Sequence, residues 1–327
     1  MRATCARLGL RFASLLPLCV SHELGAWLAP LAIRFKGRAR DSLLLNLELC
    51  FPDASPAARK ELARASLAES FRTMLELGPL WCWDKPRVLS LVREVVGLEK
   101  LDAALASGRG VVLLGPHLGA WEMVGLYVSA RAPTTSLYRA PRVPQLDGLY
   151  RRARERFGAR LVPADAGGVR ELYRALQRGE LVGVLPDQDP GPGAGLFAPF
   201  FGVLANTSAL TARLIASTRA VPLFGWAERL ERGAGFRLHF VEPESSALRN
   251  PVDVEQATRA LNLELERLIL CRPQQYLWSY RRFRNRPGGE ANPYRHGMPA
   301  TERRASRLAD GSARAPTELA AAPGRSA

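Results

Sequence analysis

Between residues 110 and 185 the chain alternates short apolar runs with amphipathic stretches. The apolar runs are rich in β-branched residues, as in strands buried on both faces, and the amphipathic stretches have helical spacing. The predicted strands are Gly110–Leu114, Thr135–Tyr138, Arg160–Pro163 and Leu181–Leu185. The predicted helices between them are Trp121–Ala130, Leu146–Phe157 and Val169–Arg178. This alternation predicts an α/β fold with a mostly parallel sheet flanked by helices.

Further elements are expected on both sides of this alternating region. An antiparallel hairpin is predicted at 221–241, around the turn-like sequence ERGAG, so the sheet is expected to be mixed. The segment 189–206 is rich in Gly, Pro and Phe and is predicted to be a long functional loop. The additional predicted helices are Arg40–Leu49, Pro56–Leu77, Thr207–Arg219 and Val252–Leu270.

The N-terminal region contains an apolar segment, Phe12–Ile33, that is long enough to cross a bilayer. His22 and Glu23 lie in its middle, and a charged centre costs about 2.5–3.5 kcal/mol on insertion scales. Arginines flank both ends, so the positive-inside rule assigns no orientation. We therefore expect an N-terminal membrane-associated helix, either a single anchor or a helix lying in the interface, with a buried core helix as the alternative.

Composition and charge limit the class of protein. Hydrophobic residues make up 47% and charged residues 24% of the 327 residues, which excludes a wholly disordered chain. The net charge of +15 indicates an anionic partner such as lipid, nucleic acid or an acidic protein. The five cysteines are scattered without a C-x-x-C motif, which disfavours a disulfide framework and a zinc ribbon. We expect a membrane segment at 1–40, one folded domain at 41–289 and a disordered basic tail at 290–327.

One histidine has a setting suited to catalysis. His117 follows the predicted strand 110–114, and Glu122 lies five residues later in the first turn of the next helix. Ligands of open parallel sheets bind at the carboxyl ends of the strands. We expect the Glu122 carboxylate to hold one nitrogen of the His117 ring and leave the other free as a general base.

The spacing itself is weak evidence, because His239 and Glu244 repeat it. His239 is predicted to lie inside a strand, where an odd offset places the two side chains on opposite faces. The chain also contains no G-x-S-x-G elbow, no P-loop and no G-x-G-x-x-G fingerprint. Hydrolysis by a serine nucleophile and nucleotide binding therefore have no support, and neither a cofactor nor a metal is predicted.

Several blocks of the chain resemble a known family. The sequence GVVLLGPHLGAWEM at 110–123 is similar to the H-x-x-x-x-[DE] block of glycerolipid-type acyltransferases. More specifically, the chain resembles the bacterial late acyltransferases of lipid A biosynthesis, the lauroyl and myristoyl transferases. The other matching blocks, in family order, are NLELCFPD at 46–53, YRAP at 138–141, PDQDPGPGAGLFAPFFG at 186–202 and PQQYLWSYRRFRNRPGG at 273–289. The chain departs from the family at Gly115–His117, where GPH replaces a commoner AHF-like sequence. It also departs at Ser279–Tyr280, where the family often has a histidine.

The resemblance implies a glycerolipid acyltransferase-like fold and transfer of an acyl chain from an acyl carrier protein thioester to a hydroxyl of a lipid A precursor. It implies catalysis by His117 and Glu122, with main-chain amides near 118–120 holding the oxyanion. The expected substrate-binding residues are Arg139, Arg154, Asp187, Gln188 and Asp189. The arginines at 281, 282, 284 and 286 are expected to form a cationic cluster that meets anionic lipid or the carrier.

The resemblance places the protein at the bacterial inner membrane, with its active site on the cytoplasmic face and no nucleic acid partner. Two alternatives stay open at this stage. The acceptor could be another glycolipid or a lysophospholipid, with the fold unchanged. A chain this basic could also be a non-enzymatic protein that binds membranes or nucleic acid.

Overall fold

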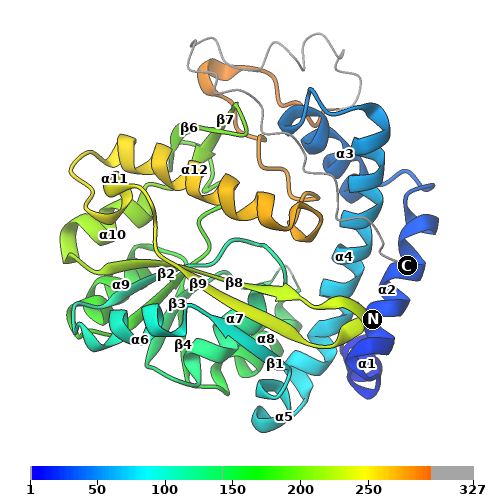
Figure 1. The fold of residues 1–327 in the computed structure, drawn as a ribbon, viewed down its shortest axis with the longest axis horizontal. Coiled ribbons are helices and arrows are strands. Elements are labelled where there is room, and N and C mark those ends of the chain that lie inside the picture. The colour runs from blue at the N-terminus through cyan, green and yellow to red at the C-terminus, as the bar shows by residue number, and fades with distance from the viewer. Residues whose placement is uncertain (1, 142, 296–327) are drawn as a thin grey trace.

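The computed structural model describes residues 2–141 and 143–295. Within these residues seven strands form one sheet in the order β1-β9-β8-β2-β5-β3-β4 (Figure 1). Neighbouring strands are parallel except for β8 and β9, so the sheet is mixed and mostly parallel, as predicted. The strands are β1 Val92–Val96, β2 Val111–Leu114, β3 Thr134–Tyr138, β4 Ala159–Pro163, β5 Leu181–Val184, β8 Val221–Arg229 and β9 Phe236–Val241.

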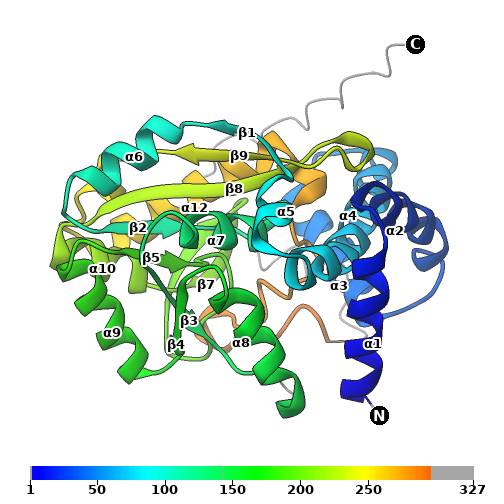
Figure 2. The same ribbon diagram turned by 90° about the horizontal axis from the view of Figure 1, so that it is seen from below.

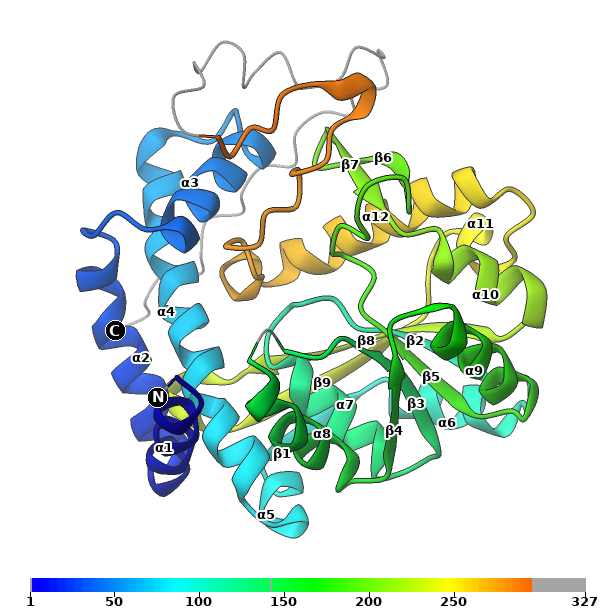
Figure 3. The ribbon, with the colours of Figure 1, turned by 180° about the vertical axis from the view of Figure 1, so that it is seen from behind.

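Helices cover both faces of the sheet, which makes three layers (Figures 1 and 3). In β2 the side chains of Val111 and Leu113 pack with α6, α7 and α8, whereas Val112 and Leu114 pack with α9, α10 and α12. All four are buried, which explains the continuous apolar run in the sequence. The helices of these layers are α6 Leu98–Ala106, α7 Trp121–Ser129, α8 Asp147–Glu155, α9 Ala166–Gln177, α10 Leu210–Thr218 and α12 Val254–Cys271.

The segment 189–206 was predicted to be a long loop, and this is wrong for its second half. There β6 Leu196–Phe200 and β7 Val203–Thr207 form an antiparallel hairpin. Two of its phenylalanines, Phe200 and Phe201, are buried, and Phe197 is partly buried. The two buried phenylalanines lie between α12 and the chain that follows it, which stabilises a hairpin despite Pro199 in the first strand.

A buried carboxyl group supports this hairpin. Phe201 has a positive φ of 48°, which non-glycine residues rarely adopt, and its amide donates to the Glu266 carboxylate of α12 at 2.7 Å. Burial raises the pKa of Glu266 to about 7, although the Phe201 amide works in the opposite direction. Glu266 is therefore expected to hold its proton in the folded protein at mildly acidic pH.

The raised pKa of Glu266 predicts a pH-dependent stability. Between about pH 4.5 and 7 the unfolded chain releases this proton while the folded chain keeps it. The stabilisation is therefore complete below about pH 4.5 and is lost as the pH rises through 7, a change of about 3 kcal/mol. Urea unfolding from pH 4 to 8 should show this loss relative to Glu266→Gln, with Glu255→Gln on the same helix as an exposed control. Parallel curves for wild type and Glu266→Gln would contradict it.

The N-terminal segment forms two helices rather than one. Helix α1 spans Arg2–Leu15 and α2 spans Leu18–Ala32, with Pro17 between them, and both pack on the long helix α4 Pro56–Cys82 (Figure 2). Helix α3 Arg38–Cys50 and the short α5 Lys85–Leu89 adjoin the same side. None of the helices in the described residues combines the length and the apolarity needed to cross a membrane.

Helix α2 turns Ser21 and His22 inward and leaves Glu23 exposed. His22 is 2% exposed, and its Nε2 lies 3.2 Å from the Glu76 carboxylate of α4. The opposite faces of the two N-terminal helices expose large apolar side chains at helical spacing. These are Leu8, Phe12 and Leu15 on α1, and Val20, Leu24, Trp27, Leu28 and Leu31 on α2.

Candidate active site

His117 lies beyond the carboxyl end of β2, where the neighbouring strand β5 also ends. The two strands are parallel with Leu114 opposite Val184. His117 is three residues beyond Leu114 and Asp187 is three residues beyond Val184, so equal offsets bring them to the same place. His117 and the 187–189 segment therefore share one edge of the sheet.

The Asp187 carboxylate contacts His117 twice. One oxygen lies 2.8 Å from the ring Nδ1, and the other accepts from the His117 main-chain amide at 2.9 Å. Burial opposes ionisation of Asp187, but the His117 ring and amide outweigh it and hold the pKa of the carboxyl below its usual value. An ionised Asp187 can only accept, so Nδ1 carries the proton. The other ring nitrogen, Nε2, is then an acceptor, and the Gln188 side-chain amide donates to it at 3.1 Å.

Glu122 does not hold the His117 ring, so this part of the sequence interpretation is corrected. Its carboxylate instead receives two bonds from the Arg154 guanidinium of α8, one of them at 3.0 Å. Both ring nitrogens of His117 have the other partners described above. The physical reason is that the loop after β5 brings Asp187 directly to Nδ1, while Glu122, in the first turn of α7, lies within reach of Arg154 of α8.

The expected substrate arginines differ in their surroundings. Arg154 lies between the rings of Trp81 and Tyr138, 5.7 and 5.9 Å from their centres, and about a third of its side chain is exposed. Burial opposes its charge, but Glu122 outweighs this and raises the pKa of Arg154. Arg139 is exposed, and within the described residues its guanidinium contacts no carboxylate. The structure therefore holds Arg154 in an ion pair and leaves Arg139 available to a ligand.

Asp189 organises the loop that carries Asp187 and Gln188. Its carboxylate accepts from the Gly191 amide at 2.8 Å, from the Asn206 side chain at 2.9 Å and from both the amide and the side chain of Asn285. The Asp189 carboxylate is therefore used for contacts within the protein. The side chain is thus engaged in fixing the loop, as in a polar turn held by its own hydrogen bonds.

Two of the three main-chain amides that were expected to hold the oxyanion, those of Gly119 and Ala120, are occupied, which corrects their expected role. Gly119 donates to the Gln275 carbonyl at 3.0 Å and Ala120 donates to the Ala227 carbonyl at 2.8 Å. The chain after His117 pairs with neighbouring strands before α7 begins, so these donors point into the protein. The amides of Gly119 and Ala120 therefore do not serve an anion at the site.

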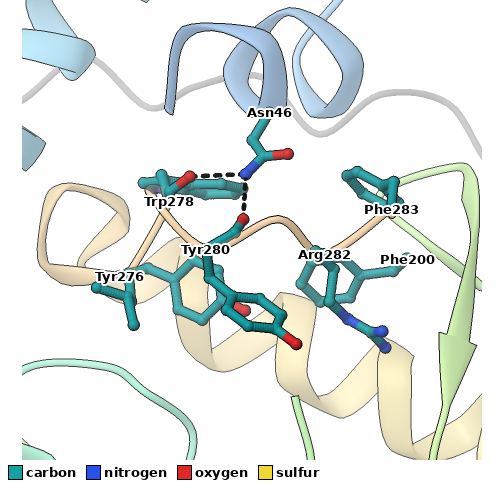
Figure 4. Close-up of a pocket in the computed structure, with 8 residues that line it drawn as sticks. Asn46, Phe200, Tyr276, Trp278, Tyr280, Arg282 and Phe283 are labelled. Atoms are coloured by element: carbon teal, nitrogen blue, oxygen red, sulfur yellow. Dashed lines mark hydrogen bonds between the residues drawn. The ribbon is translucent and has the colours of Figure 1, made fainter. Parts of the chain in front are cut away.

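The C-terminal segment 275–285 supports both sides of the site, and the sequence assigned it no such role. The Leu277 amide donates to the His117 carbonyl at 3.0 Å, and the Tyr280 hydroxyl accepts from the Asp189 amide at 3.0 Å. Asn46 of α3 fixes the segment by donating to the carbonyls of Trp278 and Tyr280, both at 2.6 Å (Figure 4). The resemblance blocks at 46–53 and 273–289 were the signal that this region matters.

A small cavity lies behind this segment, lined by Asn46, Phe200, Tyr276 and Tyr280 among others (Figure 4). Arg282 also lines it and is 3% exposed, and Arg286 is 8% exposed. Arg282 donates to the Asn206 carbonyl and the Thr207 hydroxyl, and Arg286 donates to the Leu204 carbonyl. The expected cationic cluster is therefore partly internal, because two of its four arginines stabilise the β6–β7 hairpin.

The other histidine with the same spacing has a different environment. His239 lies within β9 and stacks on the Trp226 ring at 4.2 Å, and its Nε2 contacts Glu228 rather than Glu244. It lies inside a strand, as predicted. Among the described residues no cluster of His, Cys, Asp and Glu side chains could hold a metal ion.

Comparisons with known proteins agree with the resemblance. A family model described as bacterial lipid A biosynthesis acyltransferase matches residues 6–285. The chain is 31% identical to the lipid A biosynthesis lauroyltransferase of Escherichia coli K12, over 85% of this chain and 90% of that protein. It is 33% identical to the palmitoleoyltransferase and 28% identical to the myristoyltransferase of the same organism, over 85% and 80% of this chain and 90% and 81% of those proteins. The chain therefore belongs to the bacterial lipid A biosynthesis acyltransferase family.

Proposed function

We propose that this acyltransferase moves a fatty acyl group from an acyl carrier protein thioester to a hydroxyl of a lipid A precursor, with His117 as general base. The observation that carries the proposal is the direction of the two hydrogen bonds at the His117 ring. The proton on Nδ1 is directed at Asp187, and the lone pair of Nε2 is directed at the Gln188 amide. A ring held in this way accepts a proton at Nε2.

The chemical steps follow from a ring that donates at Nδ1 and accepts at Nε2. Nε2 of His117 takes the proton of the acceptor hydroxyl as its oxygen attacks the thioester carbonyl. The carbon–sulfur bond of the tetrahedral intermediate then breaks, and the imidazolium returns the proton to the leaving thiolate. Asp187 stabilises the positive ring between the two steps, because its buried carboxylate already holds Nδ1. The products are the acyl ester and the free carrier thiol.

Gln188 occupies the position of the attacking group in the free enzyme. Its amide donates to Nε2 at 3.1 Å, as the acceptor hydroxyl must do before it loses its proton. Binding of the acceptor therefore requires the Gln188 side chain to move aside. The displaced amide remains close enough to contact the substrate, which is the binding role proposed for this residue.

We assign substrate recognition to the cationic side chains near the site. Arg139 is exposed and without a carboxylate partner in the described residues, so a phosphate of the acceptor can pair with it. Glu122 and Arg154 act as one unit, in which the carboxylate fixes the guanidinium between Trp81 and Tyr138. Catalytic support from Glu122 thus passes through Arg154 rather than through the His117 ring.

This pairing predicts non-additive losses of activity. Glu122→Gln and Arg154→Gln should each lower kcat/KM, and the double variant should lose little more than either single variant. The expected coupling energy is about 1–3 kcal/mol, because either change alone leaves the other group without its partner. The measurement is a double-mutant cycle of acyl transfer rates. Additive losses would show that Glu122 and Arg154 act separately.

We place the protein at the cytoplasmic face of the bacterial inner membrane, with α1 and α2 lying in the interface. Nine large apolar side chains of residues 8–35 are more than a third exposed, up to 83% for Trp27. Exposed cationic residues at 34, 36 and 38 adjoin them and suit anionic lipid headgroups. An exposed apolar face bordered by positive charge is the usual composition of an interfacial helix.

The exposed face predicts lipid binding without insertion across the bilayer. The triple variant Phe12→Ser, Leu15→Ser, Trp27→Ser should lower partitioning onto phosphatidylethanolamine–phosphatidylglycerol vesicles by more than about 100-fold, since each lost side chain removes about 1.5–3 kcal/mol. Val252→Ser, a fully exposed apolar residue elsewhere, is the matched control. Truncation is a poorer test, because it also removes buried His22. Equal sedimentation of the triple variant and wild type with vesicles would contradict the interfacial face.

The acceptor and donor are tested together in vitro. Purified protein should transfer radiolabelled acyl groups from an acyl carrier protein thioester to a lipid A precursor and give one additional ester per acceptor. The same assay with a lysophospholipid or another glycolipid as acceptor should show no comparable rate. Faster transfer to either of these, or equal use of a coenzyme A thioester, would overturn the proposed acceptor or donor.

A further inference from the structure

A buried arginine joins the loop after His117 to the N-terminal helices. Arg229 is the last residue of β8, and its side chain is 1% exposed. The guanidinium donates twice to Glu76, at 2.8 and 2.7 Å, and once to Glu69 at 3.2 Å. It also donates to the Gly119 carbonyl at 2.9 Å. One side chain thus contacts helix α4 and the loop two residues beyond His117.

The carboxylates that hold Arg229 also contact α2, one of the two helices that carry the exposed apolar face. His22 lies on the buried side of α2, and its Nε2 is 3.2 Å from the Glu76 carboxylate. Glu69 pairs with Arg72 at 2.5 Å, and Arg72 donates to the His22 carbonyl at 3.1 Å. Helices α2 and α4 are therefore linked by the same carboxylates that hold Arg229.

The loop side has little freedom to adjust. Gly119 has φ of +61°, and a Cβ there would meet the Ala227 carbonyl oxygen at 1.9 Å, so only glycine fits. Its amide is held by the Gln275 carbonyl, and the Gln275 side chain in turn pairs with the amide and carbonyl of Arg229 at 2.9 and 3.1 Å. The direction in which the chain leaves His117 is set by these bonds.

We propose that Arg229 is a positioning residue, which fixes the His117 loop relative to helices α2 and α4. The inference rests on the proposed role of His117 and adds a connection between the catalytic base and the helices that carry the exposed apolar face. Arg229 contacts no substrate in this account. It acts through Gly119, and its planar guanidinium is needed because it serves two carboxylates and a carbonyl at once.

The test compares Arg229→Lys with wild type in the full-length protein. Lysine keeps the positive charge between the two carboxylates but cannot form the same fork of bonds. We expect kcat for acyl transfer to fall at least 10-fold with KM changed less than 2-fold. We also expect faster hydrogen exchange at the amides of Gly119 and Ala120. The matched control is Arg59→Lys, which changes an arginine that binds three main-chain carbonyls of the α3–α4 connection.

The control separates positioning from general destabilisation. Arg59→Lys should leave exchange at Gly119 and Ala120 at the wild-type rate, even where it lowers Tm as much as Arg229→Lys does. If the lysine variant does not fold, Glu76→Gln loosens Arg229 from α4 and should raise exchange at the same two amides. Unchanged exchange there in a folded Arg229 or Glu76 variant overturns the proposal, as does an equal rise in the control. Because exchange is measured without substrate, failure of the proposed acyl transfer reaction is distinguished from failure of this inference.

Discussion

His117→Ala is expected to lower kcat for acyl transfer by about 10²–10⁴-fold, the range that a general base contributes. The reason is that no other described side chain presents an unprotonated ring nitrogen beside the 187–188 loop. The ring is 13% exposed and its loss leaves the backbone bonds of residues 117–120 in place, so the protein should fold. Rates are measured with an acyl carrier protein thioester and a lipid A precursor, and folding by circular dichroism.

His239→Ala is the control for this prediction. His239 has the same distance in sequence to a glutamate, but it stacks on Trp226 within β9. Its removal should cost less than about 1 kcal/mol of transition-state stabilisation. A folded His117→Ala protein with wild-type activity would remove the proposed mechanism.

Asp187→Asn should be almost as damaging, with kcat lowered by up to about 10⁴-fold. Asp187 uses two acceptor oxygens, one for the His117 ring and one for its main-chain amide. Asparagine has a single acceptor oxygen, so satisfying the amide turns its NH2 group toward Nδ1. The ring must then carry its proton on Nε2, where it cannot accept one from the substrate.

The same substitution changes the dependence of stability on pH. The pKa of Asp187 is below its usual value in the folded protein, so its carboxylate stabilises the fold above about pH 4, and this stabilisation is lost as the pH falls through the folded pKa. Asp187→Asn should lack that acid-dependent loss. Asp102→Asn, which alters an exposed ion pair with Arg131, is the control. Wild-type kcat in a folded Asp187→Asn protein would show that His117 needs no carboxylate partner.

The central strands were predictable because they are mostly buried. Val111–Leu114 and Leu181–Val184 form short apolar runs in the sequence, and both were predicted as strands of a mostly parallel sheet. Strand β1 was missed because VREVV at Val92–Val96 is a mostly exposed edge strand whose pattern resembles no buried run. The hairpin within 189–206 was missed because Pro199 and the glycines indicate a loop, whereas tertiary burial decides the structure.

The partner of His117 was the part of the site that sequence spacing could not determine. Glu122 is five residues away in sequence and Asp187 is seventy, yet strand pairing brings Asp187 to the ring. The missing information was the parallel register, which pairs Leu114 with Val184 and so brings together the residues three positions beyond each strand. The partner of His22 was not predicted either, because the sequence marks this residue only as a polar position within an apolar segment, whereas in the structure it faces Glu76 inside the protein.

The most direct test of the account is mass spectrometry of lipid A from a strain that lacks this protein, complemented with wild type or with His117→Ala at equal expression. The account predicts that one secondary acyl chain is missing in the deletion strain, that wild type restores it and that His117→Ala does not. Unchanged lipid A in the deletion strain, or full restoration by His117→Ala, would contradict it.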